Sequence, residues 1–197
     1  MALMILAACS GTGKSTIVRA LTQRASKLKL SVSHTTRAPR PGEVDGVAYH
    51  FVDHDQFSAM IREGAFVEWA EYAGNYYGTS HAMIRAAELA GDDLIFEVEV
   101  EGAAALKSAY PRAASCFLLP PSWDELERRL RGRKTESEEV IVRRLEEGRR
   151  EVELAHTFDH LVVNDDLEIA IEDLSCIYRA LKLQTRHQRA LLDELLS

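Results

Sequence analysis

The sequence predicts an α/β fold in which a parallel sheet is flanked by helices on both faces. Short apolar segments alternate with amphipathic ones over most of the 197 residues, the order that parallel strands and their crossover helices require. A glycine-rich loop joins the first apolar segment to the first amphipathic one. Residues 34–83, with short strands and turns, break the alternation. We therefore expect one domain over residues 1–197, with residues 34–83 inserted outside the parallel sheet.

The glycine-rich loop, ACSGTGKST at residues 8–16, is typical of a phosphate-binding site. It follows an apolar run and precedes a helical segment, which is the context that such a loop needs. Gly11 and Gly13 let backbone N–H groups approach an anion, and the following helix N-terminus favours a phosphate. Lys14 can reach the β and γ oxygens of a nucleotide, and the Ser15 hydroxyl can ligate Mg²⁺.

Two features of this loop allow other interpretations. The usual pattern opens with glycine, but Ala8 is tolerable because the remaining glycines can form the tight turns. Residues 6–9 (LAAC) fit the cleavage site of an exported lipoprotein, but no Lys or Arg precedes the apolar run, and cleavage would destroy the loop. The cysteines lack CxxC or His spacing, and no apolar run approaches the roughly 18 residues that span a bilayer. We therefore expect a cytoplasmic protein without membrane association.

The core elements follow from apolar periodicity and from helix-capping residues. Ser122 and Thr135 each begin a capping-box pattern, so we expect two helices flanking an arginine-rich turn at Gly132. The other expected helices are 15–28, 81–90, 102–109 and one long helix from 167 to 195. The expected strands are 3–7, 30–33, 93–98, 114–119 and 161–163.

Within residues 34–83 the expected elements are short. Asp53 and Gln56 form a capping box that begins a helix ending at Gly64. Residues 49–52 and 66–72 are expected to be extended. Residues 74–79, with an aromatic pair between glycines, are expected to form a turn.

Charge is segregated along the chain. Residues 1–40 carry seven Lys or Arg and no acid, whereas residues 41–110 carry thirteen acids against three bases. The basic segments suit phosphates and the acidic segment suits Mg²⁺ or a nucleobase, with a solvated surface as the alternative for any one run. The net charge of −7 argues against a general nucleic-acid-binding protein.

Four blocks of sequence, in order, resemble the guanylate kinase family. They are SHTTRAPRPGE at 33–43, GNYYGT at 74–79, RLRGR at 129–133 and VNDD at 163–166. The resemblance covers essentially the whole chain. It implies a P-loop NTPase-type core (1–33, 84–123 and 156–197), a small mixed α/β GMP-binding insert (34–83) and a helical lid (124–155). It also implies ATP and GMP as substrates and Mg²⁺ as cofactor, with a homo-oligomer left open.

The resemblance assigns a phosphate site for GMP to Arg37, Arg40, Tyr49 and Tyr77. The residue types agree with that role independently. The two arginines stand three apart in a proline-stiffened turn, where their guanidinium forks can converge on one phosphate. Each tyrosine can add a hydroxyl donor. Two exposed arginines and two core tyrosines are the alternative.

Recognition of guanine is assigned by resemblance to Glu68, with Ser33 and Thr79 beside it. Guanine presents an N1–H and an N2 amino group side by side, and one carboxylate can accept from both. Adenine lacks that pair of donors, so a carboxylate there rejects adenine. An exposed strand residue is the alternative for Glu68.

The acids after the third apolar strand depart from the family pattern. Glu97 stands where an acid positions Mg²⁺, and Glu99 matches a GMP-binding position, but the family usually has aspartate at both. Glu101 replaces a usual glutamine. In an extended chain the three would share one face, and the longer side chains could alter a magnesium site that demands tight geometry.

Arg129, Arg133 and Arg144, in the expected lid, match family residues that close over the transferring phosphates. Phosphoryl transfer needs positive charge around the equatorial oxygens and no general base for an ionised phosphate acceptor. The expected catalytic residues are Lys14, Arg37, Arg129, Arg133 and Arg144. The expected ATP-binding residues are Ser10, Gly11, Thr12, Gly13, Lys14, Ser15, Thr16 and Asn164.

Two other functions remain as alternatives. One is a non-catalytic binding module with the same fold, which the intact loop residues argue against. The other is a related phosphotransferase with a different acceptor, such as a ribose phosphate. Retention of Ser33, Glu68, Tyr77 and Thr79 argues against that acceptor.

Overall fold

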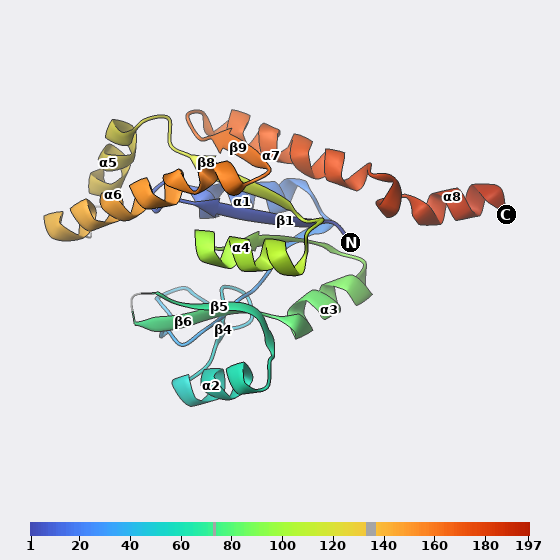
Figure 1. Cartoon of the computed structure of the whole chain (residues 1–197), viewed down its shortest axis with the longest axis horizontal. Helices are drawn as coiled ribbons and strands as arrows, with labels where there is room; N and C mark the ends of the chain where they lie inside the picture. The colour runs from blue at the N-terminus through green and yellow to red at the C-terminus, as the bar shows by residue number, and fades with distance from the viewer. Residues whose placement is uncertain (73, 133–136) are drawn as a thin grey trace.

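The protein contains a five-stranded parallel sheet and a smaller four-stranded sheet (Figure 1). The computed structural model describes residues 1–72, 74–132 and 137–197. Every neighbouring pair in the larger sheet is parallel, which confirms the predicted fold class. The order of its strands is β2 (Leu28–Leu30), β7 (Asp93–Glu97), β1 (Leu3–Ala8), β8 (Ala114–Leu119) and β9 (His160–Val163).

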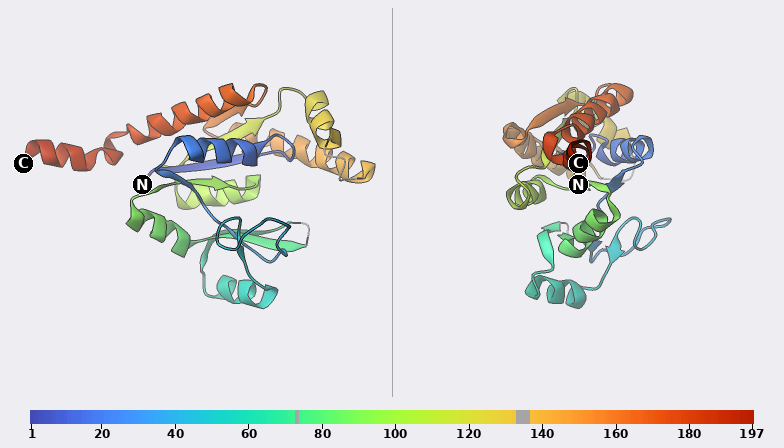
Figure 2. Two further views of the ribbon diagram at one scale, coloured as in Figure 1. Left: turned by 180° about the vertical axis from the view of Figure 1, so that it is seen from behind. Right: turned by 90° about the vertical axis from the view of Figure 1, so that its right-hand side faces the viewer.

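The central strand β1 is buried on both faces. Met4 and Leu6 belong to one hydrophobic cluster, and Leu3 and Ile5 belong to the other. Because side chains alternate along a strand, one continuous apolar run fills both cores. Helices α1 and α7 cover the first side and α4 the second, as Figures 1 and 2 show. The helices of the larger layer are α1 (Lys14–Arg24), α3 (His81–Ala90), α4 (Val100–Ala109), α5 (Trp123–Gly132), α6 (Glu138–Glu153) and α7 (Leu167–Lys182).

The first predicted helix is too long at its C-terminal end. We expected residues 15–28, but α1 ends at Arg24 and Ala25 is already extended. Leu28 begins β2, a position from which it pairs with Asp93 of β7. Its side chain is fully buried there, so pairing at the sheet edge overrides helical periodicity.

The single C-terminal helix predicted from 167 to 195 is wrong. It divides into α7, a 3₁₀ turn at Thr185–His187 and α8 (Arg189–Leu196). The core ends at Leu181, and Leu183 is 72% exposed. Figure 1 shows α8 extending away from the body. Beyond the core, no packing supports one continuous helix, although the apolar stripe in the sequence goes on.

The helix predicted at 102–109 begins earlier, at Val100. Glu97 is consequently the last residue of β7, Glu99 is the helix N-cap, and Glu101 lies in the first helical turn. The three acids do not share one extended face, and that expectation is wrong. The chain turns directly after the strand, as crossover connections in parallel sheets do.

The smaller sheet lies on the far side of α4 from β1 in Figure 1. Its strand order is β4 (His50–Phe51), β3 (His34–Thr35), β6 (Asn75–Ser80) and β5 (Phe66–Tyr72). The capping box predicted at α2 (His54–Arg62) is confirmed: Asp53 and Gln56 exchange side-chain and backbone hydrogen bonds of 2.7 and 3.1 Å.

Residues 74–79 were expected to form a turn, and this is wrong for all but the first of them. Asn75–Ser80 is strand β6, antiparallel to β5. Gly78, which suggested a turn, is required inside the strand. A Cβ there would lie 2.9 Å from the Phe66 ring and 3.1 Å from the Phe57 ring. The glycine serves close packing rather than chain reversal.

Helices α5 and α6 lie at one end of the larger sheet, opposite α8 (Figures 1 and 2). The Ser122 cap is confirmed by a 3.1 Å bond from the Glu125 N–H to its hydroxyl. Thr135 lies outside the described residues, and α6 begins after Ser137. Within the described parts of the chain, none of the helices has both the length and the apolar character needed to cross a membrane.

Candidate active site

The glycine-rich loop lies between β1 and α1, as predicted. Gly11 and Gly13 have φ of 96° and 98°, which side chains disfavour. A Cβ on Gly11 would lie 2.8 Å from Leu130 Cδ2, and one on Gly13 would lie 2.8 Å from Asn164 Nδ2. Both glycines are therefore required by conformation and by packing. The loop closes on itself through a 2.8 Å bond from the Thr12 hydroxyl to a loop carbonyl.

Cys9 belongs to the packing of the loop rather than to its chemistry. Its side chain is buried, and a Cβ on Gly148 of α6 would lie 3.2 Å from the Cys9 Cβ. Burial raises the pKa of Cys9 to about 11, so the thiol stays protonated at neutral pH. Helix α6 thus approaches the loop closely at this point.

Lys14 and Ser15 face the end of β7. Lys14 Nζ donates to the Val98 carbonyl at 2.8 Å and lies 3.2 Å from Glu99 Oε1. The Ser15 hydroxyl donates to Glu97 Oε1. The exposed Thr16 follows on the helix. The structure therefore brings the predicted loop residues together with Glu97 and Glu99.

Oxygen donors suitable for a magnesium ion meet at Ser15 and Glu97. A hydroxyl and a carboxylate match a hard cation that usually keeps several waters and nucleotide oxygens as its other ligands. In residues 1–72, 74–132 and 137–197, no group of three His, Cys, Asp or Glu side chains could hold a metal ion by itself. The residues present thus fit a magnesium ion that arrives with a nucleotide, and they do not form an all-protein site.

Asn164 lies under the loop. Its side-chain Nδ2 donates to the Thr12 carbonyl at 2.6 Å. The backbone carbonyl of Asn164 accepts from Arg129 Nη2 at 3.1 Å. The side chain is buried. In this structure the Asn164 amide supports the loop backbone, so its assignment to ATP stays a prediction.

Two of the predicted lid arginines lie on different helices, and one of them contacts the loop. Arg129 of α5 donates from Nε to Glu125 at 2.7 Å. Arg144 of α6 donates from Nη1 to the Ser10 hydroxyl at 3.2 Å. Arg133 lies outside the described residues. Arg144 therefore brings positive charge to the loop, whereas Arg129 is bound to Glu125 and to the backbone carbonyl of Asn164.

Glu151 of α6 was not predicted as a site residue, and the structure places it beside Glu99. The charge of Glu99 and that of Lys14 both act on the Glu151 carboxyl group, in opposite directions. Burial, followed by the Glu99 charge, raises the pKa of Glu151 to about 7. No local pattern distinguishes this glutamate from its neighbours on an acidic helix.

The proposed acceptor-phosphate residues gather around Arg37. Its Nη2 lies 2.8 Å from Glu43 Oε1, and its guanidinium carbon lies 5.4 Å from the centre of the Tyr49 ring. The Tyr49 and Tyr77 rings meet edge to face, 5.9 Å apart. The hydrogen bond to Glu43 raises the pKa of Arg37. Arg37, Tyr49 and Tyr77, three of the four predicted residues, thus lie together.

Glu43 was quoted in the sequence motif but was not assigned a role. It binds the Arg37 side chain and also accepts from the Arg40 backbone N–H at 2.7 Å. The Arg37 hydrogen bond lowers the pKa of Glu43. Glu43 therefore holds the turn that carries both arginines. The sequence signal for this role is the spacing, because a carboxylate six residues after an arginine in a turn can reach back to it.

The guanine residues predicted from the sequence lie on neighbouring strands. Glu68 of β5 is directly opposite Thr79 of β6, and the Thr79 hydroxyl donates to Glu68 Oε1 at 2.5 Å. Burial raises the pKa of Glu68, and the Thr79 bond offsets part of that rise. The Ser33 carbonyl accepts from the His50 N–H at 2.9 Å where the chain enters the smaller sheet.

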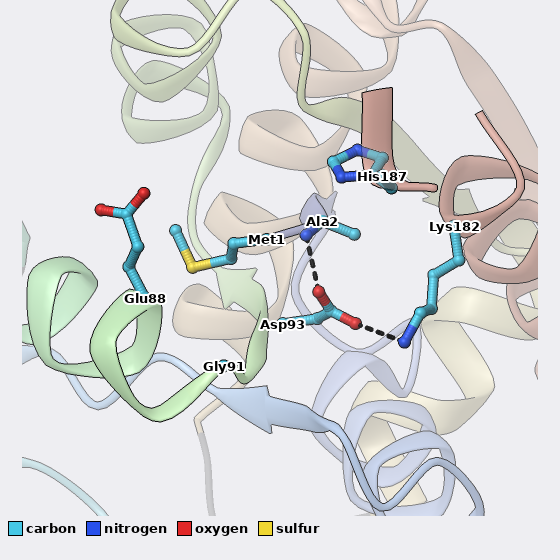
Figure 3. Close-up of a pocket in the computed structure, with 7 residues that line it drawn as sticks. All are labelled: Met1, Ala2, Glu88, Gly91, Asp93, Lys182 and His187. Atoms are coloured by element: carbon cyan, nitrogen blue, oxygen red, sulfur yellow. Dashed lines mark hydrogen bonds and ion pairs between the residues drawn. The ribbon is translucent and has the colours of Figure 1, made fainter. Parts of the chain in front are cut away.

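Two cavities lie at the other end of the parallel sheet, away from this cluster. One, of about 210 Å³, is lined by residues that include Asp93 and Lys182 (Figure 3). Asp93 accepts from the Ala2 N–H at 2.6 Å and the Tyr178 hydroxyl at 2.7 Å, and it lies 3.0 Å from Lys182 Nζ. The second, of about 470 Å³, lies beside the first and shares His187 with it. Since Asp93 already has three donors, we assign it a structural role.

Comparison with known proteins identifies one family. The family model described as guanylate kinase matches residues 1–181. A guanylate kinase of Neisseria gonorrhoeae is 48% identical over 194 residues, covering 98% of this chain and 95% of that protein. One of Salmonella typhi is 47% identical over 197 residues, covering 99% and 95%. A crystal structure of guanylate kinase from Anaplasma phagocytophilum superimposes with a TM-score of 0.78 at 28% identity, covering 98% and 93%.

Proposed function

Because the chain belongs to the guanylate kinase family, we propose that it transfers the γ-phosphoryl group of ATP to GMP, giving ADP and GDP. The phosphate-binding loop alone indicates a nucleotide and no particular acceptor. The observation that carries the proposal is the Glu68–Thr79 pair. It offers a half-buried carboxylate in a sheet separate from the loop, where a second, guanine-bearing substrate can bind.

On the donor side, the loop residues and Lys14 hold the phosphates of ATP. Ser15 and Glu97 hold Mg²⁺, which neutralises charge on the phosphate oxygens when it is bound. Lys14 exchanges its present contacts with Val98 and Glu99 for phosphate oxygens. This exchange replaces one neutral carbonyl and one carboxylate by more highly charged acceptors, which strengthens the interaction.

On the acceptor side, Arg37, Tyr49 and Tyr77 bind the GMP phosphate, with Arg40 beside them. Their present contacts support this assignment, since Glu43 aligns Arg37 and the tyrosine rings flank it. Glu68 accepts from the N1–H and N2 amino group of guanine. The remaining residues assigned to GMP are Ser33, Thr79 and Glu99.

Transfer itself depends on position and charge. The attacking phosphate oxygen is already ionised at neutral pH, so no side chain has to remove a proton. Arg129, Arg133 and Arg144 supply positive charge to the oxygens of the transferring group, where it stabilises the transition state most. Closure of residues 34–83 and 124–155 over the core excludes water, which would otherwise compete as acceptor.

A cytoplasmic location fits this activity. All three cysteines are free, and two of them are buried, as is usual for proteins of a reducing compartment.

The test is Mg²⁺-dependent ADP release from ATP with GMP, AMP, CMP or UMP as acceptor, beside a Lys14→Ala control. We expect turnover with GMP that far exceeds the other acceptors and that the control abolishes. Equal turnover with AMP and GMP, or GMP turnover that survives in the control, would contradict the proposal. A ribose phosphate tested as a fifth acceptor distinguishes the related phosphotransferase.

A further inference from the structure

The first turn of α4 lies against the carboxylate of Glu68. Gly102, the third residue of the helix, is buried at this contact. A Cβ built on Gly102 would lie 3.0 Å from Glu68 Oε2 and 3.5 Å from Glu68 Cδ. The first distance is shorter than ordinary van der Waals contact, so a side chain at position 102 would force the Glu68 carboxylate to shift by a few tenths of an ångström.

Glu68 has little freedom to move aside. Its other oxygen, Oε1, accepts from the Thr79 hydroxyl at 2.5 Å, and β5 is fixed by antiparallel pairing with β6. The same added carbon would also lie 3.4 Å from Val98 Cβ. An alanine at position 102 would therefore push the Glu68 carboxylate aside by a few tenths of an ångström and strain its bond to Thr79.

Glycine in a helix requires a reason, because it is less favourable there than alanine. Gly102 has ordinary helical backbone angles, so no left-handed conformation demands it. The approach of Glu68 supplies the reason. Proximity to the N-terminal end of α4, where the helix dipole is positive, also favours a carboxylate at this place.

We propose that Gly102 is a specificity-determining residue and that the first turn of α4 forms the rear wall of the guanine site. The absence of a side chain at position 102 lets Glu68 keep both oxygens aligned for the paired N–H donors of guanine. This inference rests on the proposed function, because it takes Glu68 as the residue that binds the base.

The direct test is the Gly102→Ala variant in steady-state kinetics. We expect the KM for GMP to rise by about tenfold or more, the scale of losing one well-aligned hydrogen bond to a charged group. The KM for ATP should stay within about twofold, because the phosphate-binding loop is untouched. The melting temperature should change little, because the helix preference of alanine offsets the cost of the crowded contact. A merely structural role would not separate the two KM values.

Ala104→Ser is the matched control. It also adds one heavy atom to α4, but on the exposed face of the helix, and both KM values should stay within about twofold of wild type. A double-mutant cycle with Glu68→Ala gives the second readout. In the Glu68→Ala background, Gly102→Ala should change the KM for GMP by less than about twofold, because the carboxylate that it displaces is gone.

The outcomes separate this inference from the proposed function. If Glu68→Ala raises the KM for GMP and Gly102→Ala does not, only the role of Gly102 is overturned. The role of Gly102 is also overturned if the effects of Gly102→Ala and Glu68→Ala on the KM for GMP are fully additive. If the wild-type protein does not phosphorylate GMP, the proposed function and this inference both fail. If wild type phosphorylates GMP but Glu68→Ala leaves the KM for GMP unchanged, Glu68 does not bind the base, and this inference fails while the phosphoryl transfer stands.

Discussion

The two ends of the parallel sheet hold carboxylates in opposite situations. At the end where the strands begin, Asp93 has three donors around it, two of which, the Ala2 N–H and Lys182, appear in Figure 3. Burial alone would raise the pKa of Asp93, but the Ala2 N–H, the Tyr178 hydroxyl and Lys182 together lower it. At the end where the strands finish, burial and the charge of Glu99 raise the pKa of Glu151 to about 7.

This difference distinguishes a structural acid from acids of a binding site. Asp93 ties the start of β1 to β7 and α7, so its charge is compensated within the protein and contributes to folding. The acids near Lys14 are incompletely compensated, and a site prepared for external groups has this character. Substitutions at the first end should therefore reduce stability, and substitutions at the second should reduce activity or even raise stability.

The largest expected effect is that of Lys14→Ala. Loss of the ammonium group removes a charge that acts on the transferring phosphate, so kcat should fall by about a thousandfold or more. The free energy of unfolding should fall by only about 1 kcal/mol, the worth of the Lys14 hydrogen bond to Val98. Stopped-time ADP assays and chemical denaturation measure the two quantities. A fall in the free energy of unfolding as large as the rise in the activation barrier would show that Lys14 has a structural role.

Asp93→Asn should show the reverse pattern. It leaves Lys182 without its acid and weakens two hydrogen bonds, so unfolding should become easier by about 2 to 3 kcal/mol at pH 7. The kcat of the folded variant should stay within about twofold of wild type. Urea denaturation and kinetics on the same preparation provide the comparison. Tyr178→Phe, which removes one donor, should cost about 1 kcal/mol.

The pH dependence of the Asp93 effect has a defined sign. Because the pKa of Asp93 is lower in the folded protein, its contribution is present above its unfolded pKa near 3.8 and disappears as pH falls through the folded value. The difference in the free energy of unfolding between wild type and Asp93→Asn should therefore become smaller in strongly acidic solution. A difference that grows as the pH falls would contradict the structural role of Asp93.

An effect of opposite sign, on stability alone and dependent on pH, is expected for Glu151→Gln. The folded-state pKa of Glu151 is about 7 against an ordinary 4.5, so the folded protein loses stability as pH rises between these values. The variant should melt above wild type at pH 8 and show no such advantage at pH 4. Differential scanning calorimetry at both values measures this. Glu153→Gln, on the exposed side of the same helix segment, is the control and should show no pH-dependent gain.

Features carried by local sequence were predictable. The apolar run of β1 predicted a buried strand, and the glycines of the loop predicted a tight turn of the backbone between strand and helix. Asp53 and Gln56 marked a helix start because a capping box involves only four consecutive residues. Each of these signals depends on neighbours in the chain, so sequence alone contains it.

Features created by distant segments were not predictable. Strand β6 was read as a turn because Gly78 is explained only by the rings of Phe57 and Phe66 packed against it. The break between α7 and α8 occurs where the core ends, and the periodicity of the sequence does not record that place. Glu151 and Gly102 matter through Glu99 and Glu68, which come from other elements.

The most direct test of the account is the ratio of kcat/KM for GMP to that for AMP, in wild type and in Glu68→Gln. The amide keeps the size of the side chain but loses its charge and one of its acceptor oxygens. We predict that the ratio falls by about a hundredfold, mainly through GMP, while the KM for ATP stays the same. An unchanged ratio would show that Glu68 does not select the base and would contradict the site described above.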